Sequence, residues 1–219
     1  MEHNPAAKLI IENIQMLEHA AHLLESVIHK KIFNTIDQVI KDSVLEFNDD
    51  MIGIYDHYEN ETWFLSSSWK FEPFNIENNK THNNIYAFYM LETDNLKNEK
   101  PSWWISHLFS NSYDQAVFSF CIYKNGFLKI SKSELKQFCI QQNDEYPILQ
   151  QIGFRFDPNI NRWYLPISFL DQKTVSKHYE NDTLEDALAP FNEALNILKQ
   201  AHSTFNLIVQ AAKKQFQIE

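Results

Sequence analysis

The sequence predicts an α+β protein in which a mostly antiparallel, twisted sheet is flanked by long N- and C-terminal helices packed as an antiparallel pair. Two observations lead to this prediction. Apolar residues repeat with heptad-like spacing at both ends of the chain, and short alternating or wholly apolar runs lie between them. No linker rich in Gly, Pro or Ser divides the chain, so a single domain is expected over residues 1–219.

The N-terminal helical segment is expected over residues 6–47. Apolar residues recur there at alternating steps of four and three from Ile10 to Ile28, and the series continues with extra steps of four. Such extra steps favour a straighter helix over a supercoiled one. The pattern fits one continuous helix and fits equally well a break near Lys30–Lys31 or Asn34.

The C-terminal helix is expected over residues 183–217, with Thr183 and Asp186 as a capping pair at its start. Apolar side chains then repeat at steps of four and three as far as Phe216, and His202 occupies one position of this seam. A seam of this kind needs a partner. The N-terminal helix offers a matching seam, which predicts a coiled-coil-like hairpin of the two termini, and the competing interpretation is a homo-oligomer formed through either seam.

The middle of the chain, residues 51–170, carries the strand signals. Asn125-Gly126 between two apolar runs is a strong hairpin signal. A nearly continuous apolar run is typical of a central, buried strand, and residues 85–92 form one. The expected strands are 51–58, 62–70, 85–92, 117–123, 127–130, 153–156 and 163–170, with short helices at 102–109 and 133–142.

Composition excludes several functional classes. The chain has only three glycines, far apart, so the glycine-rich loops that cradle phosphate groups are absent. No G-x-S-x-G nucleophile elbow occurs. The formal net charge is −10, which opposes general binding to nucleic acid, because such binding needs a basic face. No catalytic signature emerges, so the balance favours a protein that is not an enzyme.

The chain shows no signal for export or for a membrane. The N-terminus lacks a basic stretch followed by an apolar run, and no segment approaches the ~18 apolar residues of a membrane span. We therefore expect a cytoplasmic protein. Cys121 and Cys139 are expected to be reduced and inert under those conditions. Aromatic residues reach 14% and favour a core of large side chains, which leaves open whether some line a ligand pocket.

The first helix carries the densest set of metal-ligand side chains. Glu18, His22, Glu25 and His29 follow at steps of four, three and four, so they share one face. That face lies opposite the apolar stripe, whereas a metal site in a bundle points inward. Since i,i+4 pairs of this type also stabilise exposed helix faces, we expect a solvated face and no bound metal or other cofactor.

A run of acids without intervening bases is the second notable feature. Seven carboxylates fall between Lys41 and Lys70, and their local field would attract a basic surface. Solvent-facing loops and a divalent-metal site are the other interpretations, since hard cations bind several carboxylate oxygens. The predicted partner-binding residues are Asp42, Glu46, Asp49, Asp50, Asp56, Glu59 and Glu61.

The expected element order also resembles the core of PD-(D/E)XK nucleases. The shared order is helix, three strands, helix, strand, over residues 31–47 and 51–123. The resemblance implies that an Asp near the second strand and a Glu-x-Lys on the third hold Mg²⁺. Asp56 or Glu61 could supply the first position and Glu92 the second, but no Lys stands two residues after Glu92. The implied motif is therefore incomplete.

Three functional hypotheses follow. The leading one is a non-enzymatic module that binds a basic protein partner through the acidic run, as immunity proteins, antitoxins and inhibitors do. The alternative is a degenerate PD-(D/E)XK-like, Mg²⁺-dependent nuclease or hydrolase with Asp56, Glu61 and Glu92. The third is a structural subunit that forms homo-oligomers through the helical seams.

Overall fold

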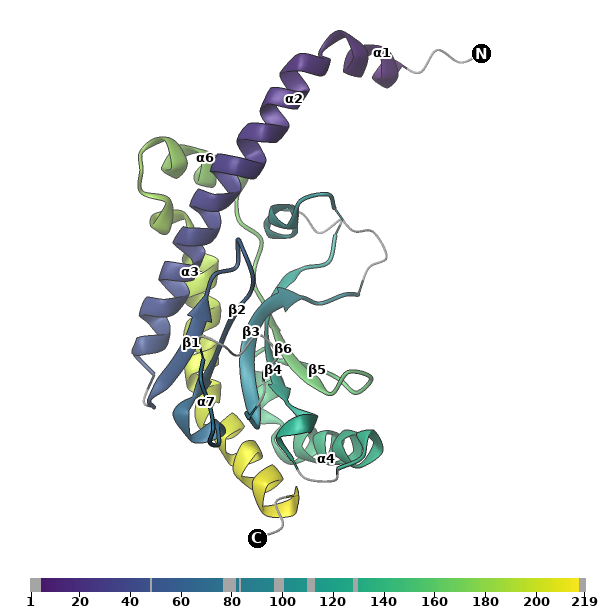
Figure 1. The fold of residues 1–219 in the computed structure, drawn as a ribbon, viewed down its shortest axis with the longest axis vertical. Coiled ribbons are helices and arrows are strands. Elements are labelled where there is room, and N and C mark those ends of the chain that lie inside the picture. The colour runs from purple at the N-terminus through teal and green to yellow at the C-terminus, as the bar shows by residue number, and fades with distance from the viewer. Residues whose placement is uncertain are drawn as a thin grey trace.

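A computed structural model describes residues 5–47, 49–76, 82, 84–96, 101–109, 113–127 and 130–216 of the chain. It confirms the α+β class (Figure 1): a six-stranded antiparallel sheet packs against the long helices formed by the two ends of the chain. No helix among these residues is long and apolar enough to cross a membrane.

The sheet has the strand order β1-β2-β3-β4-β6-β5, and each neighbouring pair is antiparallel. The predicted first hairpin, the central apolar strand and the last hairpin are all present, although their strands are shorter than expected. Short connections, residues 56–61 between β1 and β2 and residues 158–161 between β5 and β6, explain why local sequence located these pairs well. The strands are β1 Met51–Tyr55, β2 Thr62–Ser66, β3 Ala87–Thr93, β4 Ala116–Ile122, β5 Arg155–Asp157 and β6 Arg162–Pro166.

The Asn125-Gly126 segment does not form the expected hairpin turn. Residues 124–126 form the 3₁₀ turn η4 (Lys124–Gly126), and Phe127 is buried outside any strand. A Cβ at Gly126 would lie 2.0 Å from the Ile85 carbonyl oxygen, so the glycine allows the turn to press against the start of the neighbouring segment. Residues 128 and 129 of the expected strand 127–130 lie outside the described part of the chain.

The N-terminal helical segment is divided at a different place from the one expected. It comprises α1 (Pro5–Glu12), α2 (Ile14–Leu23), a π-helical turn η1 (Leu24–Ile28) and α3 (His29–Leu45). The helix direction changes at Asn13 (Figure 1), and no break occurs at Lys30–Lys31 or Asn34. The π turn ends just before the two lysines, so the irregularity is a widened turn and not an interruption.

The C-terminal helix α7 (Ala189–Phe216) starts later than predicted. Thr183 makes no side-chain cap bond. It instead precedes a short 3₁₀ turn, η5 (Leu184–Ala187), and its hydroxyl bonds the His178 ring. The predicted end of the helix at 217 lies outside the described residues. The remaining helices are η2 (Ser67–Trp69), η3 (Trp104–Leu108), α4 (Lys132–Glu145), α5 (Ile148–Gln151) and α6 (Gln172–Glu180).

The two long helices pack together, but they run in the same direction, so the predicted antiparallel direction of the pair is wrong. Ion pairs show this, because residue numbers rise together along both partners: Lys31 pairs with Asp182, Glu46 with Lys199, and Asp49 with His202. The reason is the route of the chain. From β6 it passes through α6, which lies beside the start of α3 (Figure 1), and α7 then descends alongside α3.

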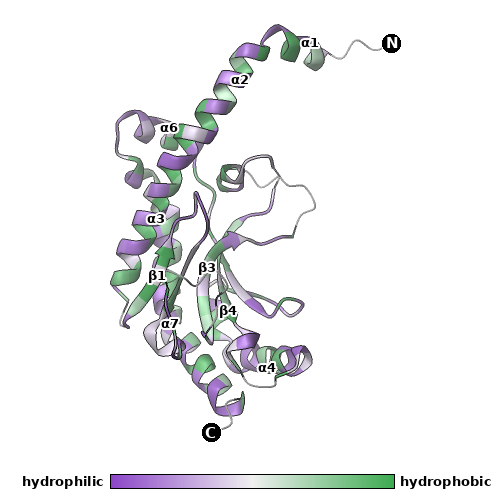
Figure 2. Ribbon diagram, viewed as in Figure 1, coloured by the Kyte–Doolittle hydropathy of each residue, from purple (hydrophilic) through white to green (hydrophobic). Residues whose placement is uncertain are grey.

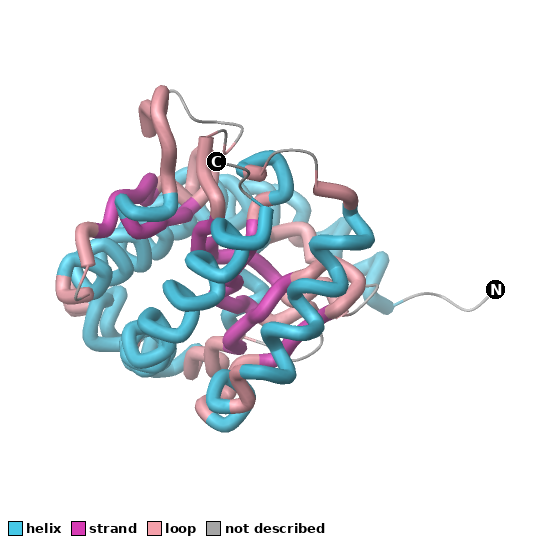
Figure 3. Tube along the Cα trace, turned by 90° about the horizontal axis from the view of Figure 1, so that it is seen from below, coloured by secondary structure: helices cyan, strands magenta, loops and turns pink. Residues whose placement is uncertain are grey.

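The core is an aromatic layer between α7 and one face of the sheet. Figure 3 shows the strands of this sheet with helices beside them. The Phe205 ring stacks on Phe120 of β4 at a centroid distance of 4.1 Å and meets Tyr89 of β3 at 5.8 Å. All three side chains are fully buried. Large aromatic side chains bury more area than any others, so this layer accounts for part of the high aromatic content.

His202 on α7 connects this core to its edge. Its Nδ1 lies 3.0 Å from the Tyr89 hydroxyl and its Nε2 lies 3.2 Å from Asp49 Oδ2. Both ring nitrogens therefore have partners, and the side chain joins α7 to β3 and to the segment after α3. This arrangement matches the structural role expected of a polar residue in a helical seam.

Substitution of Leu198 by Ala tests the packing of α7. Leu198 is fully buried, so its truncation should lower the free energy of unfolding by about 2–5 kcal/mol. The matched control is Leu207→Ala on the same helix, whose side chain is 55% exposed and whose loss should cost less than about 0.5 kcal/mol. Urea unfolding followed by circular dichroism measures both, and equal losses would contradict this packing.

Candidate functional site

The strongest site candidate is a pocket of about 400 Å³ at the end of the sheet where β1 and β2 are joined. Three elements supply its walls: the start of α3, the β1–β2 turn and the segment that leads into η3. The volume lies near the lower end of the range for small-ligand pockets. The lining residues are His29, Phe33, His57, Tyr58, Asn60, Ser102, Trp103 and Trp104.

Two histidines of this pocket carry ring nitrogens that have no hydrogen-bond partner among the described residues. These atoms are His29 Nε2 and His57 Nδ1, and both are shielded from solvent. Buried polar atoms are nearly always paired in folded proteins, because an unpaired one costs the full desolvation penalty. These two atoms belong to residues that line one pocket, which makes it the strongest candidate for a ligand site among the described residues.

Aromatic rings hold the two histidines in place. The His57 ring meets the Trp104 indole edge-on at a centroid distance of 4.3 Å, and Phe33 lies 5.6 Å from His29 and 5.2 Å from His57. Burial lowers the pKa of His57 to about 4. Burial also lowers the pKa of His29, although the nearby Glu25 carboxylate opposes that shift. At neutral pH the His57 ring is uncharged, so one of its nitrogens is a hydrogen-bond acceptor.

A buried carboxylate fixes the turn that carries His57. Asp37 of α3 is 4% exposed, and its Oδ2 accepts the backbone N–H of His57 at 2.8 Å. Its Oδ1 accepts the Thr62 hydroxyl of β2. Burial raises the pKa of the Asp37 carboxyl, while these two hydrogen bonds oppose the rise. Asp37 thus ties the β1–β2 turn to α3 and positions the pocket wall.

The π turn η1 closes the site from the helical side. The Trp103 indole N–H donates to Glu25 Oε1 at 3.1 Å, and the Tyr58 hydroxyl donates to the Glu25 backbone oxygen at 3.0 Å. Single π turns inside helices are frequent at functional sites, where they redirect side chains. Here the turn ends at Ile28, directly before His29, whose Nε2 has no partner among the described residues.

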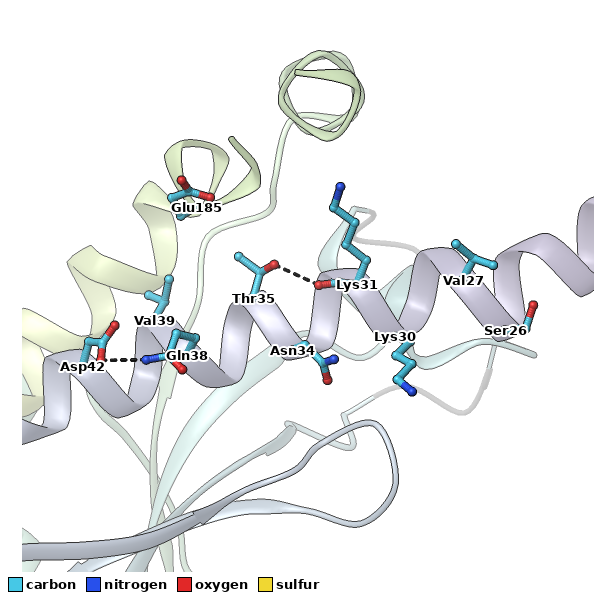
Figure 4. Close-up of a pocket in the computed structure, with 10 residues that line it drawn as sticks. All are labelled: Ser26, Val27, Lys30, Lys31, Asn34, Thr35, Gln38, Val39, Asp42 and Glu185. Atoms are coloured by element: carbon cyan, nitrogen blue, oxygen red, sulfur yellow. Dashed lines mark hydrogen bonds between the residues drawn. The ribbon is translucent and has the colours of Figure 1, made fainter. Parts of the chain in front are cut away.

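The larger hollow on the surface, about 690 Å³, is a different kind of feature. It is a groove along the outer side of α3 beside η5 (Figure 4). Its polar side chains largely bond one another or nearby backbone and turn residues: Lys31 reaches Asp182 after α6, Thr35 bonds the Lys31 backbone oxygen, and Gln38 bonds Asp42. Since these groups are already paired, the groove has less reason to hold a polar ligand.

The helix face that carries Glu18, His22, Glu25 and His29, predicted to be solvated, divides in two. Glu18 and His22 are exposed to solvent as expected, whereas Glu25 receives the Trp103 bond and His29 lines the pocket. No group of three or more His, Cys, Asp or Glu side chains that could hold a metal occurs among the described residues. The sequence therefore located two residues of the site but assigned them to a solvated face.

The seven predicted acids do not form one patch. Asp42, Glu46, Asp49 and Asp50 lie at the end of α3 and before β1, while Asp56, Glu59 and Glu61 lie in the turn after β1. Glu46 pairs with Lys199, Asp49 with His202 and Glu61 with His82. The turn acids adjoin the pocket, because His57, Tyr58 and Asn60 lie between them and line it.

The residues of the nuclease resemblance are engaged elsewhere. Glu92 of β3 bonds Arg162 and Ser119, Asp56 accepts the Asn60 side chain at 2.6 Å, and Glu61 faces His82 at 3.4 Å. These carboxylates thus have separate partners, and the donor set offers no common point for Mg²⁺.

Comparison of the chain with protein-family models, curated proteins and solved structures finds no match.

Replacement of His57 by Asn tests the pKa assignment. Because the pKa of His57 is about 4 in the folded protein and 6.5 when unperturbed, the unfolded chain takes up the proton first as the pH falls. The stability that depends on neutral His57 is complete above about pH 6.5 and is lost toward pH 4. Between pH 7 and pH 5, wild type should therefore lose about 1–2 kcal/mol more than His57→Asn in urea unfolding.

The matched control for this measurement is His19→Asn, at an exposed position of α2. Its stability should follow the wild-type pH profile. Identical profiles for wild type and His57→Asn would show that His57 titrates normally in the folded state and would remove the basis for a neutral imidazole in the pocket.

Proposed function

We propose that the protein is a non-enzymatic binding module for a basic protein partner, and that the pocket formed by His29, His57 and Trp104 receives a cationic side chain of that partner. The observation that carries the proposal is the pair of buried imidazole nitrogens without partners in a pocket walled by indoles. The cation is the arginine guanidinium or the lysine ammonium.

The chemistry of the pocket fits a cation better than an anion. A neutral imidazole can accept a hydrogen bond from a guanidinium or ammonium N–H. Trp103 and Trp104 line the pocket, and an indole ring attracts positive charge over its face, most strongly where water is excluded. An anion would need donors with positive charge, and the low pKa of His57 opposes a charged imidazole there.

The charges around the pocket support the same assignment. The Glu25 carboxylate lies at its edge through the bond from Trp103, and Asp56 and Glu59 belong to the turn that forms its wall. Charges of one sign around a concave site raise the local concentration of the opposite ion and speed association. The part of the acidic run that bears on partner binding is then the turn at 56–61.

Binding of small analogues tests the pocket directly. We expect N-acetyl-arginine amide to perturb tryptophan fluorescence saturably, with a dissociation constant in the roughly millimolar range for so small a ligand. The citrulline analogue has almost the same shape without the charge and should bind at least about tenfold more weakly, since a charge-assisted hydrogen bond is about twice as strong as a neutral one. Equal binding of the two analogues would overturn the assignment.

Variants separate the pocket from the rest of the surface. His29→Phe and Trp104→Leu should each weaken arginine-analogue binding about tenfold, because one removes an acceptor and the other an aromatic face. Asp50→Asn, at the far end of β1 and exposed, is the matched control and should bind as wild type does. Lysine and arginine analogues that bind all four proteins alike would show that the pocket is not the site.

Charge reversal separates the two groups of acids in partner binding. In capture experiments with cell extract, Asp56→Lys with Glu59→Lys should release a basic partner at lower salt than wild type requires, since these residues adjoin the pocket. Asp42→Lys with Asp50→Lys changes the net charge equally but acts at the other end of β1. If the second pair has the larger effect, the pocket is not the centre of the interface.

A further inference from the structure

The segment Pro5–Ile28, which we call the arm, extends away from the body of the protein (Figure 1). It comprises α1, α2 and η1, and none of the described residues of these three elements is buried. Yet it is rich in apolar side chains (Figure 2). Eight of them are 41–72% exposed: Leu9, Ile10, Ile11, Ile14, Met16, Leu17, Leu23 and Val27.

The apolar residues of the arm form a broad face. Within residues 14–28, which follow the change of direction at Asn13, one stripe includes Ile14 and Leu17, and a second, displaced by one residue, includes Met16, Leu23 and Val27. Neighbouring residues differ by about 100° around a helix, so the two stripes together cover roughly half of its circumference. A single coiled-coil seam is narrower.

The exposed apolar area is too large for an ordinary monomer surface. From the exposed fractions of its eight large side chains, the arm presents on the order of 700 Å². The largest apolar patch of a typical monomer is about 300–600 Å², and a standard protein interface buries about 800 Å² per partner. The arm therefore carries nearly enough surface for one side of a stable interface.

The base of the arm is held firmly on the body. Tyr58 and Trp103 both donate hydrogen bonds to Glu25, and the helix continues directly into α3, whose residues Ile32, Phe33 and Ile36 are buried. The apolar face is thus presented in a fixed direction. Preorganisation of this kind lowers the entropy that association costs.

We infer that the arm pairs with the arm of a second copy of the chain, in antiparallel orientation. The charge of the arm disfavours a lipid surface as the alternative: the exposed polar face carries Glu12, Glu18 and Glu25 against Lys8. Helices that bind membrane surfaces instead concentrate Lys and Arg there. A second arm supplies an apolar face of the same width, so each covers the other.

The net charge favours the antiparallel orientation. Each chain carries a formal charge of −10, and parallel arms would place two acidic bodies side by side. Antiparallel pairing over the straight part of the arm, residues 14–28, places the bodies at opposite ends of a helix pair about 22 Å long at 1.5 Å per residue. That separation exceeds the Debye length of about 8–10 Å in physiological salt.

This inference is independent of the proposed ligand of the pocket, and light scattering coupled to size-exclusion chromatography tests it. The full chain should show twice its mass of 26.0 kDa at micromolar concentrations and dissociate on dilution. Ile14→Glu with Leu17→Glu should raise the dissociation constant at least a hundredfold and leave a monomer. Both positions are already exposed, so the thermal unfolding of the monomer should not change.

The matched control is Leu207→Glu, which places a charge at an exposed apolar position of α7 outside the arm and should leave the dimer intact. Wild type that stays monomeric at about 100 μM, or a dimer that survives the double substitution, would overturn the inference. So would wild-type protein that remains monomeric and binds vesicles of neutral phospholipid through Ile14 and Leu17.

Small-angle X-ray scattering of the dimer tests the orientation. Antiparallel arms should give a pair-distance distribution with a second maximum from two separated bodies. A single maximum at short distance would show the bodies side by side and would overturn the antiparallel arrangement.

Discussion

The contact between Phe205 of α7 and the aromatic face of β3 and β4 is the interaction on which the remaining architecture depends. One helix covers that face of the sheet, and α3 is placed by packing against both α7 and β1. α7 begins at Ala189, beside the middle of α3. No part of α7 therefore covers the residues of the N-terminal helical segment that precede this point. The arm is exposed because the body ends where α7 and the sheet end. Its isolation is thus a geometric consequence of how the core is covered.

The pocket depends on the same geometry, at the end of the sheet that adjoins the base of the arm. Asp37 lies on α3, which packs against β1, and from there it holds the turn that carries His57. A side chain buried in the core thereby positions a ring whose own nitrogen has no partner among the described residues. Both oxygens of the Asp37 carboxylate accept hydrogen bonds, whereas His57 Nδ1 in the adjoining turn has no partner among the described residues. That contrast within a single turn distinguishes the pocket from the groove along α3, where Gln38 and Lys31 bond their neighbours.

Local sequence predicted the elements well and their assembly less well. The apolar period of α7 and the short β1–β2 and β5–β6 connections are local signals, so both the helix and the two hairpins were predictable. The direction of α7 relative to α3 depends on α6 and η5, which carry no strong sequence signal. Asn125-Gly126 misled because contact with Ile85, distant in sequence, decides its conformation. In the site, the sequence showed that Glu25 and His29 share one helix face. It could not show that Trp103 and Trp104, about 75 residues later in the chain, complete the pocket.

The two cysteines have a practical consequence for studying the molecule. Cys121 and Cys139 are both buried, and burial raises the pKa of each thiol to about 12. Thiolate is the reactive form, so alkylating reagents should leave the folded chain unmodified at neutral pH. Alkylation of Cys121 or Cys139 would then occur only when local unfolding exposes β4 or α4. The alkylation rate therefore measures how often these elements unfold. The native sequence therefore already contains a probe of its own core that requires no substitution.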